Sequence, residues 1–237
     1  MAKKFFPILV LAVFFAGTLA AQEREQEAAP AGLFSAGVGG LIGGDFGGGA
    51  EGNADVVSMK FTTPYFGGGA YAFFDAKYAE FSLAFYGGGG KFKQTMEYGG
   101  TSQTGEVDSS ITNFNIGLLG KYPFAINDKL ALFPLLGIDY SICLSAKRDE
   151  KEYKNKDGND ASGDFSALWF KFGGGGDFSL TEKVYLRLEA LYGIRLANKA
   201  EADMEDIIKA RVQGVDIKTK TLLGHGLTVK LGVGYSF

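Results

Sequence analysis

The chain has 237 residues, of which 46% are hydrophobic and 22% charged, and its formal net charge is −3, so apolar and polar positions must be interleaved. Beyond the first twenty residues no uninterrupted apolar stretch approaches the ~20 residues that a spanning helix needs, which excludes a bundle of transmembrane helices. The mildly acidic balance argues against nucleic acid as a partner, and the single cysteine, Cys143, excludes an intrachain disulfide.

The N-terminus has the pattern of a cleaved export signal. Lys3 and Lys4 precede an apolar run over residues 5–16, and small residues follow over 17–21. A membrane-anchoring helix is the alternative, but the run is short, contains Pro7 and is followed at once by polar residues. We therefore expect a signal peptide at 1–21, a short polar segment at 22–31 and one β-barrel domain at 32–237.

Hydrophobic alternation with a period of two residues runs through that domain and places successive side chains on opposite faces of a strand. In the last segment Leu227, Val229 and Leu231 alternate with Thr228 and Lys230. The same pattern predicts eight strands, over residues 34–42, 57–75, 80–85, 113–118, 132–142, 168–172, 184–196 and 227–237.

The predicted connections alternate between short and long. We expect tight turns near 75–78, 125–129 and 179–183, and long polar loops near 46–55, 99–108, 146–163 and 198–220. Residues 200–211 could form a short helix with Met204, Ile207 and Ile208 on one side. Short turns on one side and long loops on the other are typical of outer-membrane barrels, with the turns and both termini in the periplasm. Pro64 and Pro134 lie inside strand segments, where a missing N–H predicts bulges or irregular pairing.

A closed barrel follows from this pattern if the sheet spans a membrane. Every backbone N–H and C=O in lipid must be paired internally, so the sheet cannot have an edge. The expected fold is all-β: a closed antiparallel transmembrane up-and-down β-barrel of eight strands. Aromatic residues near the predicted periplasmic strand ends would form an interfacial girdle; they are Phe74, Tyr78, Tyr122, Phe124, Phe133, Phe178, Tyr185, Tyr235 and Phe237.

The last strand ends in Leu231, Val233, Tyr235 and C-terminal Phe237. With the export signal and the loop pattern, it resembles the small bacterial outer-membrane β-barrel superfamily, which includes the OmpA membrane domain, OmpX and OmpW. The resemblance covers nearly all of the mature chain, as architecture rather than as a close sequence motif. It implies an outer-membrane location, and it implies that these four residues form the assembly signal read by the barrel-assembly machinery during insertion.

Charged residues gather at the alternate strand positions whose side chains are expected to point into the barrel. An eight-stranded barrel is only wide enough to be filled by side chains or to hold one small ligand. The inward charges are Glu80, Lys121, Asp139, Lys171, Asp177, Arg187, Glu189, Arg195 and Lys230. Counted from the periplasmic strand ends, opposite charges on neighbouring strands lie at similar heights. This predicts four pairs: Glu80 with Lys121, Asp139 with Lys171, Asp177 with Arg187, and Glu189 with Lys230. We expect a charge-paired lumen, either as a plug that fills the barrel or as a gated, proton-linked narrow path.

The residue inventory predicts no enzyme. The one histidine, His225, lies between two glycines, and no serine stands at the His-x-Ser spacing of outer-membrane lipid A deacylases. One histidine and one cysteine also leave no transition-metal cluster. We therefore expect no catalytic, metal-binding or cofactor-binding residues.

Two functions remain open. The first is a structural or surface-interaction barrel, with outer-membrane lipid and a host or surface ligand as partners of its extracellular loops. The second is a narrow channel or an OmpW-like transporter of small molecules, hydrophobic ones included, in which the weak, Gly-rich first strand could open sideways.

Overall fold

The computed structural model describes residues 34–237, apart from 47, 55–56, 155–158, 197 and 212–217. The predicted signal peptide and polar segment therefore lie outside the described residues. No helix in the described part of the chain is both long and apolar enough to cross a membrane.

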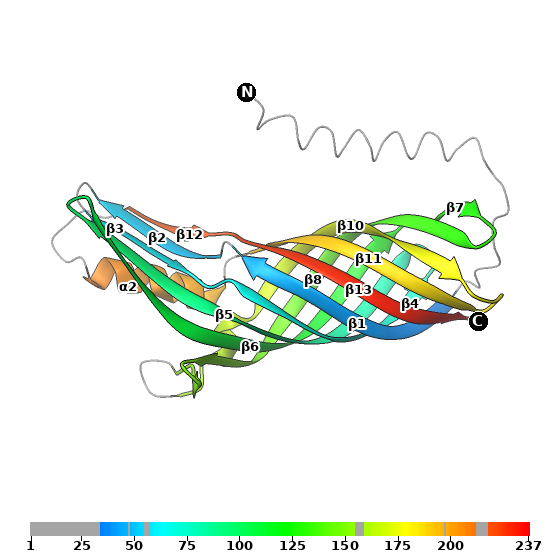
Figure 1. Cartoon of the computed structure of the whole chain (residues 1–237), viewed down its shortest axis with the longest axis horizontal. Coiled ribbons are helices and arrows are strands. Elements are labelled where there is room, and N and C mark those ends of the chain that lie inside the picture. The colour runs from blue at the N-terminus through cyan, green and yellow to red at the C-terminus, as the bar shows by residue number, and fades with distance from the viewer. Residues whose placement is uncertain (1–33, 47, 55–56, 155–158, 197, 212–217) are drawn as a thin grey trace, which may run out of the picture.

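Eight antiparallel strands form a closed ring (Figure 1). In the order of the ring they are β1 (Phe34–Phe46), β4 (Tyr65–Ala76), β5 (Ala79–Tyr98), β6 (Thr101–Lys121), β8 (Leu130–Arg148), β10 (Ala167–Ser179), β11 (Val184–Arg195) and β13 (Gly224–Ser236). The ring closes where β1 pairs with β13, for example at Val38 and Val233. The predicted fold class is confirmed.

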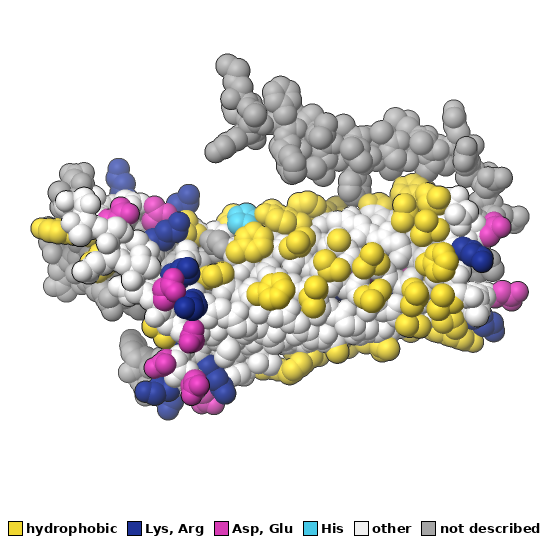
Figure 2. Space-filling view, viewed as in Figure 1, with side chains coloured by type: hydrophobic (Ala, Val, Ile, Leu, Met, Phe, Trp, Pro, Cys, Tyr) yellow, Lys and Arg dark blue, Asp and Glu magenta, His cyan; other side chains and the backbone are white. Residues whose placement is uncertain are grey.

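The outer wall is apolar and the interior is polar, because side chains alternate along every strand. Val38, Phe85 and Leu231 are exposed on the outside, while Glu80 and Arg187 are fully buried. Figure 2 shows hydrophobic side chains along the barrel and charged ones gathered toward its two ends. An apolar exterior of this extent fits hydrocarbon rather than water, so the ring is a membrane-spanning barrel.

One end of the barrel carries short turns, and the other carries an extension (Figure 1). The turn end holds Phe34, Phe237 and the turns at Lys77–Tyr78, Asp128–Lys129 and 180–183, as predicted. In the second of these turns the Asn127 side chain accepts hydrogen bonds from the backbone N–H groups of Lys129 and Leu130, both at 2.9 Å. We name the two ends the turn end and the extension end.

The extension continues the wall as a sheet of five strands. It joins β12 (Lys218–Leu222), β2 (Gly49–Ala54) and β3 (Val57–Thr62) to the outer parts of β5 and β6. Helix α2 (Lys199–Arg211) packs against this sheet, where Ile208 joins a core with Met59, Phe61 and Phe92. The remaining elements are β7 (Phe124–Asn127), β9 (Lys151–Glu152) and the short helix η2 (Ser162–Phe165).

Two of the predicted long loops are wrong, because strands occupy those residues. Range 46–55 contains β2. Range 99–108 belongs mostly to β6, and the two-residue turn Gly99–Gly100 joins β5 directly to β6. Both glycines have positive φ, 54° and 82°, which suits glycine at a tight turn. The outer half of this hairpin is solvated on much of its surface, so its sequence lacks the apolar alternation that marks a strand in lipid.

The helix predicted in the last loop is present as α2, and Ile208 is buried there. The side chains of Met204 and Ile207 lie outside the described residues. The single strand predicted over 57–75 is divided into β3 and β4 at Thr63 and Pro64, where the ladder is interrupted.

Pro134 lies inside β8 and pairs with Gly174 of β10 on one side. On its other side the ladder breaks between β6 and β7, because Lys121 pairs with Leu135 and the next described pair is Phe124 with Leu132. The pairing near this proline is irregular, as predicted.

Candidate functional site

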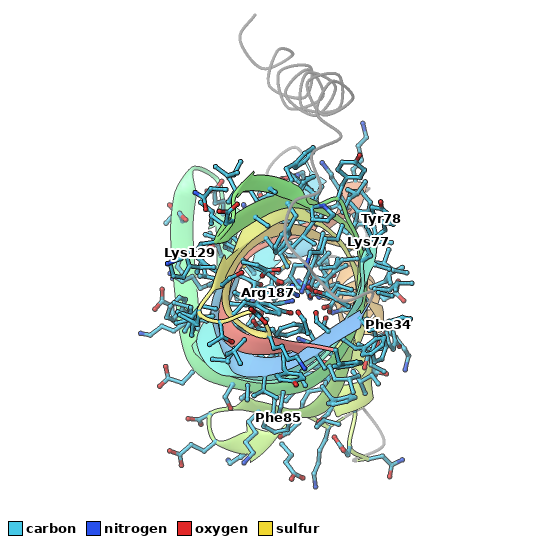
Figure 3. The ribbon with its side chains drawn as sticks, turned by 90° about the vertical axis from the view of Figure 1, so that its right-hand side faces the viewer. Phe34, Lys77, Tyr78, Phe85, Lys129 and Arg187 are labelled. Atoms are coloured by element: carbon cyan, nitrogen blue, oxygen red, sulfur yellow. The ribbon has the colours of Figure 1, made fainter. Side chains whose placement is uncertain are left out.

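A cluster of seven charged side chains fills the lumen toward the turn end. We name it the lumen ionic cluster, and its members are Asp75, Glu80, Lys121, Asp177, Arg187, Glu189 and Lys230. Arg187 is 0% exposed and lies inside the ring in Figure 3, whereas Phe34 and Phe85 point outward. Its guanidinium donates to Asp177 Oδ1 at 2.7 Å, to Glu80 Oε2 at 2.9 Å and to Asp75. One arginine thus joins strands β4, β5, β10 and β11.

Two lysines complete the cluster. Lys121 lies 2.8 Å from Asp75 and 3.3 Å from Asp177. Lys230 lies 3.1 Å from Glu189 and 3.5 Å from Glu80. Four carboxylates therefore meet three cations, and each charge has an opposite charge beside it, which offsets part of its desolvation cost.

Three of the four predicted pairs lie together in the structure: Asp177 with Arg187, Glu189 with Lys230, and Asp139 with Lys171 at 3.1 Å. The fourth pairing, Glu80 with Lys121, is not the one observed. Glu80 contacts Arg187 and Lys230, and Lys121 contacts Asp75 and Asp177. The strands of a barrel are tilted relative to its axis, so residues at equal positions along different strands need not lie at the same height in the lumen. Counting positions along each strand separately cannot predict that offset.

Sequence reasoning placed Asp75 in a turn and missed it as a member of the cluster. It has the same parity as Tyr71 and Phe73, and all three are buried. The parity of Tyr71 and Phe73 could have revealed it, because Asp75 continues their inward series. Two residues of the predicted girdle, Phe133 and Tyr185, are also buried inside rather than facing lipid.

Aromatic rings surround the ionic cluster. Arg187 lies 4.2 Å from the ring centre of Phe73, and Lys121 lies 4.1 Å from that of Phe133. Glycines make room for these rings: a Cβ at Gly37 would come within 2.4 Å of Phe73, and one at Gly234 within 2.1 Å of Tyr185. The glycine content of the strands therefore serves the packing of a narrow barrel.

A second region of the lumen, between the ionic cluster and the extension, encloses a cavity of about 80 Å³. We name it the upper cavity. Trp169, Asn115 and the pair of Asp139 with Lys171 line it, and Lys230 connects it to the ionic cluster.

An apolar groove of about 510 Å³ indents the outside of the wall at the same level. We name it the wall groove. Ile42, Phe46 and Phe66 line it beside Pro64, where β3 and β4 are divided. The wall groove and the upper cavity share four lining residues, Gly43, Gly44, Asp45 and Tyr65, so they lie on opposite sides of one thin part of the wall.

At the extension end, Arg195 ties the barrel to α2. It lies 3.3 Å from Asp45 and 2.7 Å from Glu201. Glu201 and Asn198 also form a reciprocal helix cap: Glu201 N–H donates to Asn198 Oδ1 at 3.0 Å, and Asn198 N–H donates to Glu201 Oε2 at 3.2 Å. Burial raises the pKa of Glu201, and Arg195 opposes that shift.

The remaining predicted residues lie along β13 and directly after it. His225 Nδ1 is 2.7 Å from the hydroxyl of Tyr192. Leu231, Val233 and Tyr235 are exposed on the outer wall. At the turn end the N–H of Phe237 donates to the carbonyl of Phe34 at 3.1 Å. The described residues contain no group of three or more His, Cys, Asp or Glu side chains that could hold a metal ion.

The ring, its apolar exterior and its ionic interior define an eight-stranded membrane β-barrel. Neither a protein-family model nor a curated protein matches the chain.

Solved structures that resemble it include the outer membrane protein OprG from Pseudomonas aeruginosa, with 13% identity and a TM-score of 0.44 over 89% of this chain and 98% of that one. Neisserial surface protein A has 16% identity and a TM-score of 0.37, over 86% and 97%. The attachment invasion locus protein Ail of Yersinia pestis, solved with the heparin analogue sucrose octasulfate, has 14% identity and a TM-score of 0.35, over 86% and 99%.

Proposed function

We propose that this chain is an outer-membrane barrel without enzymatic activity or cofactor, whose charge-filled lumen is closed and whose extension contacts molecules at the cell surface. The observation that carries the proposal is the lumen ionic cluster, in which Arg187, Glu80 and Glu189 are each 0% exposed. Side chains this enclosed leave little room for a continuous water path through the barrel.

The extension supports a surface role. In the orientation we propose, the turn end faces the periplasm and the extension faces outward. The β5–β6 hairpin then presents a largely polar surface, on which Lys91 and Lys93 lie 3.3 and 2.9 Å from Glu106. Residues 101–106 are all exposed, so they are available to lipid head groups or to a ligand on another surface.

Two measurements test this proposal. The purified barrel should give no conductance steps in a planar bilayer, and steady ion-conducting steps would contradict a closed lumen. A variant in which the exposed Ser102, Gln103 and Thr104 are each replaced by Glu should still fold, shown by its heat-dependent gel mobility, but should lose binding to vesicles that carry the outer-leaflet lipid. Equal binding by the unaltered chain and this variant would contradict the surface role.

The wall groove favours a second candidate, lateral passage of small hydrophobic molecules between lipid and lumen. The outward-facing Gly44 and Phe66 are paired across β1 and β4 beside the groove. In a Cys143→Ser background, cysteines at both positions should lock this part of the wall when oxidised. Uptake of a hydrophobic dye by proteoliposomes should stop on oxidation and return on reduction; uptake unaffected by the lock would exclude this route.

A further inference from the structure

The lumen ionic cluster has one more carboxylate than it has cations, and one half of it is already balanced. Asp75 and Asp177 both contact Lys121, at 2.8 and 3.3 Å. Both also accept hydrogen bonds from the guanidinium of Arg187. Two carboxylates therefore meet two cations in this half, and each carboxylate has the donors that its ionised form needs.

Glu80 and Glu189 form the other half and share one lysine. Lys230 Nζ lies 3.5 Å from Glu80 and 3.1 Å from Glu189. Arg187, already engaged with both aspartates, gives Glu80 one hydrogen bond at 2.9 Å and lies 3.8 Å from Glu189. The ring of Tyr71, 5.1 Å from Lys230 Nζ, adds no charge. Both glutamates are 0% exposed, so water does not screen the repulsion between them.

The other inward-facing charges of the described strands do not supply the missing cation. Lys171 is bound to Asp139 at 3.1 Å, and those two charges cancel. Arg195 is engaged with Asp45 and Glu201, where two carboxylates again meet one cation. The excess negative charge at Glu80 and Glu189 must therefore be removed within that pair.

The side chains of Glu80 and Glu189 are hydrogen-bonded to each other. An ionised carboxylate only accepts hydrogen bonds, so a bond between two carboxyl groups requires a proton on one of them. Two carboxylates that share a buried site do not both ionise. We propose that Glu80 and Glu189 hold one proton between them, which leaves the lumen ionic cluster with three negative and three positive charges.

This proton makes the stability of the ring depend on pH. An exposed glutamate has a pKa of about 4.3, so above that pH the unfolded chain has lost a proton that the folded ring keeps. The stabilisation is complete below that pH and is lost as pH rises. Over the range in which the pair keeps its proton, the folding equilibrium constant should fall by up to about tenfold for each pH unit.

Infrared spectroscopy tests the proposal, because the C=O stretch of a protonated carboxyl is separate from the bands of carboxylates and backbone amides. The full chain should show this band when it is folded at neutral pH in a detergent without ester groups. Glu80→Gln should reduce the band by one carboxyl. Glu182→Gln, the same change at an exposed turn position, should leave it unchanged. Absence of the band from the full chain, or an equal band in both variants, would overturn the proposal.

The pH profile of urea unfolding in lipid vesicles distinguishes a bound proton from a purely structural role of Glu80. Glu80→Gln should flatten the fall of stability with rising pH, because glutamine needs no bound proton to donate a hydrogen bond. Glu182→Gln should keep the slope of the full chain. Heat-dependent gel mobility verifies that each variant folds. If Glu80→Gln does not fold, Glu189→Gln removes the same proton, and the infrared band of the unaltered chain still decides. An unchanged slope in the folded Glu80→Gln would contradict the proposal.

Discussion

The ring near the turn end and the extension share strands β5 and β6, but the two regions lie in different solvents. In the ring, β5 and β6 place apolar side chains in lipid and charged ones in the lumen, so each face has a distinct character. In the extension, the same strands meet water, and their stability comes from a small core between α2 and the sheet. The lipid-facing ring thus depends on an ionic centre, whereas the extension depends on an apolar one.

Removing Arg187 should give the largest effect. Arg187→Leu leaves Asp75, Glu80 and Asp177 buried without their common cation, which should lower the free energy of unfolding by about 3–5 kcal/mol. Urea unfolding in lipid vesicles measures this loss. Lys199→Leu, an exposed change in α2, serves as the control. A loss no greater than that of the control would mean that the ionic centre does not hold the ring.

Ile208→Ala should affect the extension and spare the ring. Ile208 is 0% exposed in the core under α2, so its truncation should weaken helix docking by about 2–4 kcal/mol. Hydrogen exchange of the α2 amides should become faster, while the temperature of the gel-mobility shift stays constant. A shift of that temperature would show that the two regions unfold together.

A pair of glycine substitutions compares the two regions directly. A Cβ at Gly37 would come within 2.3 Å of the Val233 carbonyl, whereas one at Gly105 would meet nothing within 4 Å. Gly37→Ala should therefore cost about 1–3 kcal/mol, and Gly105→Ala should be nearly neutral. Equal effects in urea unfolding would contradict the close packing of the ring.

The smallest effect is a pH dependence of α2 docking. Burial raises the pKa of Glu201, so the docked helix favours the protonated carboxyl. Docking should be strongest below the ordinary carboxyl pKa of about 4.3 and weaken as pH rises through the raised pKa. Glu201→Gln should remove this dependence. Hydrogen exchange of α2, corrected for intrinsic rates, measures it; an unchanged pH profile in the variant would contradict the role of Glu201.

The ring could be predicted because lipid imposes alternation on the sequence. The alternation locates all eight strands of the ring. It also places Asp75 on the inward face with Tyr71 and Phe73, but a single strand does not show which charges that carboxylate meets across the lumen. The extension lacked the signal, because strands β2 and outer β6 are polar on exposed faces and resemble loops. The alternation marks Trp169 only as part of a strand, because its position against Gly193 and Gly226 depends on neighbouring strands.

The two-residue turn at Gly99 and Gly100 has a consequence for the order of folding. It joins the longest hairpin among the residues that the structure describes, whose strands pair from Tyr98 with Thr101 to Ala79 with Gly120. Contacts so close in sequence carry a small loop-closure entropy, whereas joining Val38 to Val233 must bring together distant parts of the chain. We therefore expect the hairpin to form early and act as a template for its neighbours, and the seam between β1 and β13 to form last.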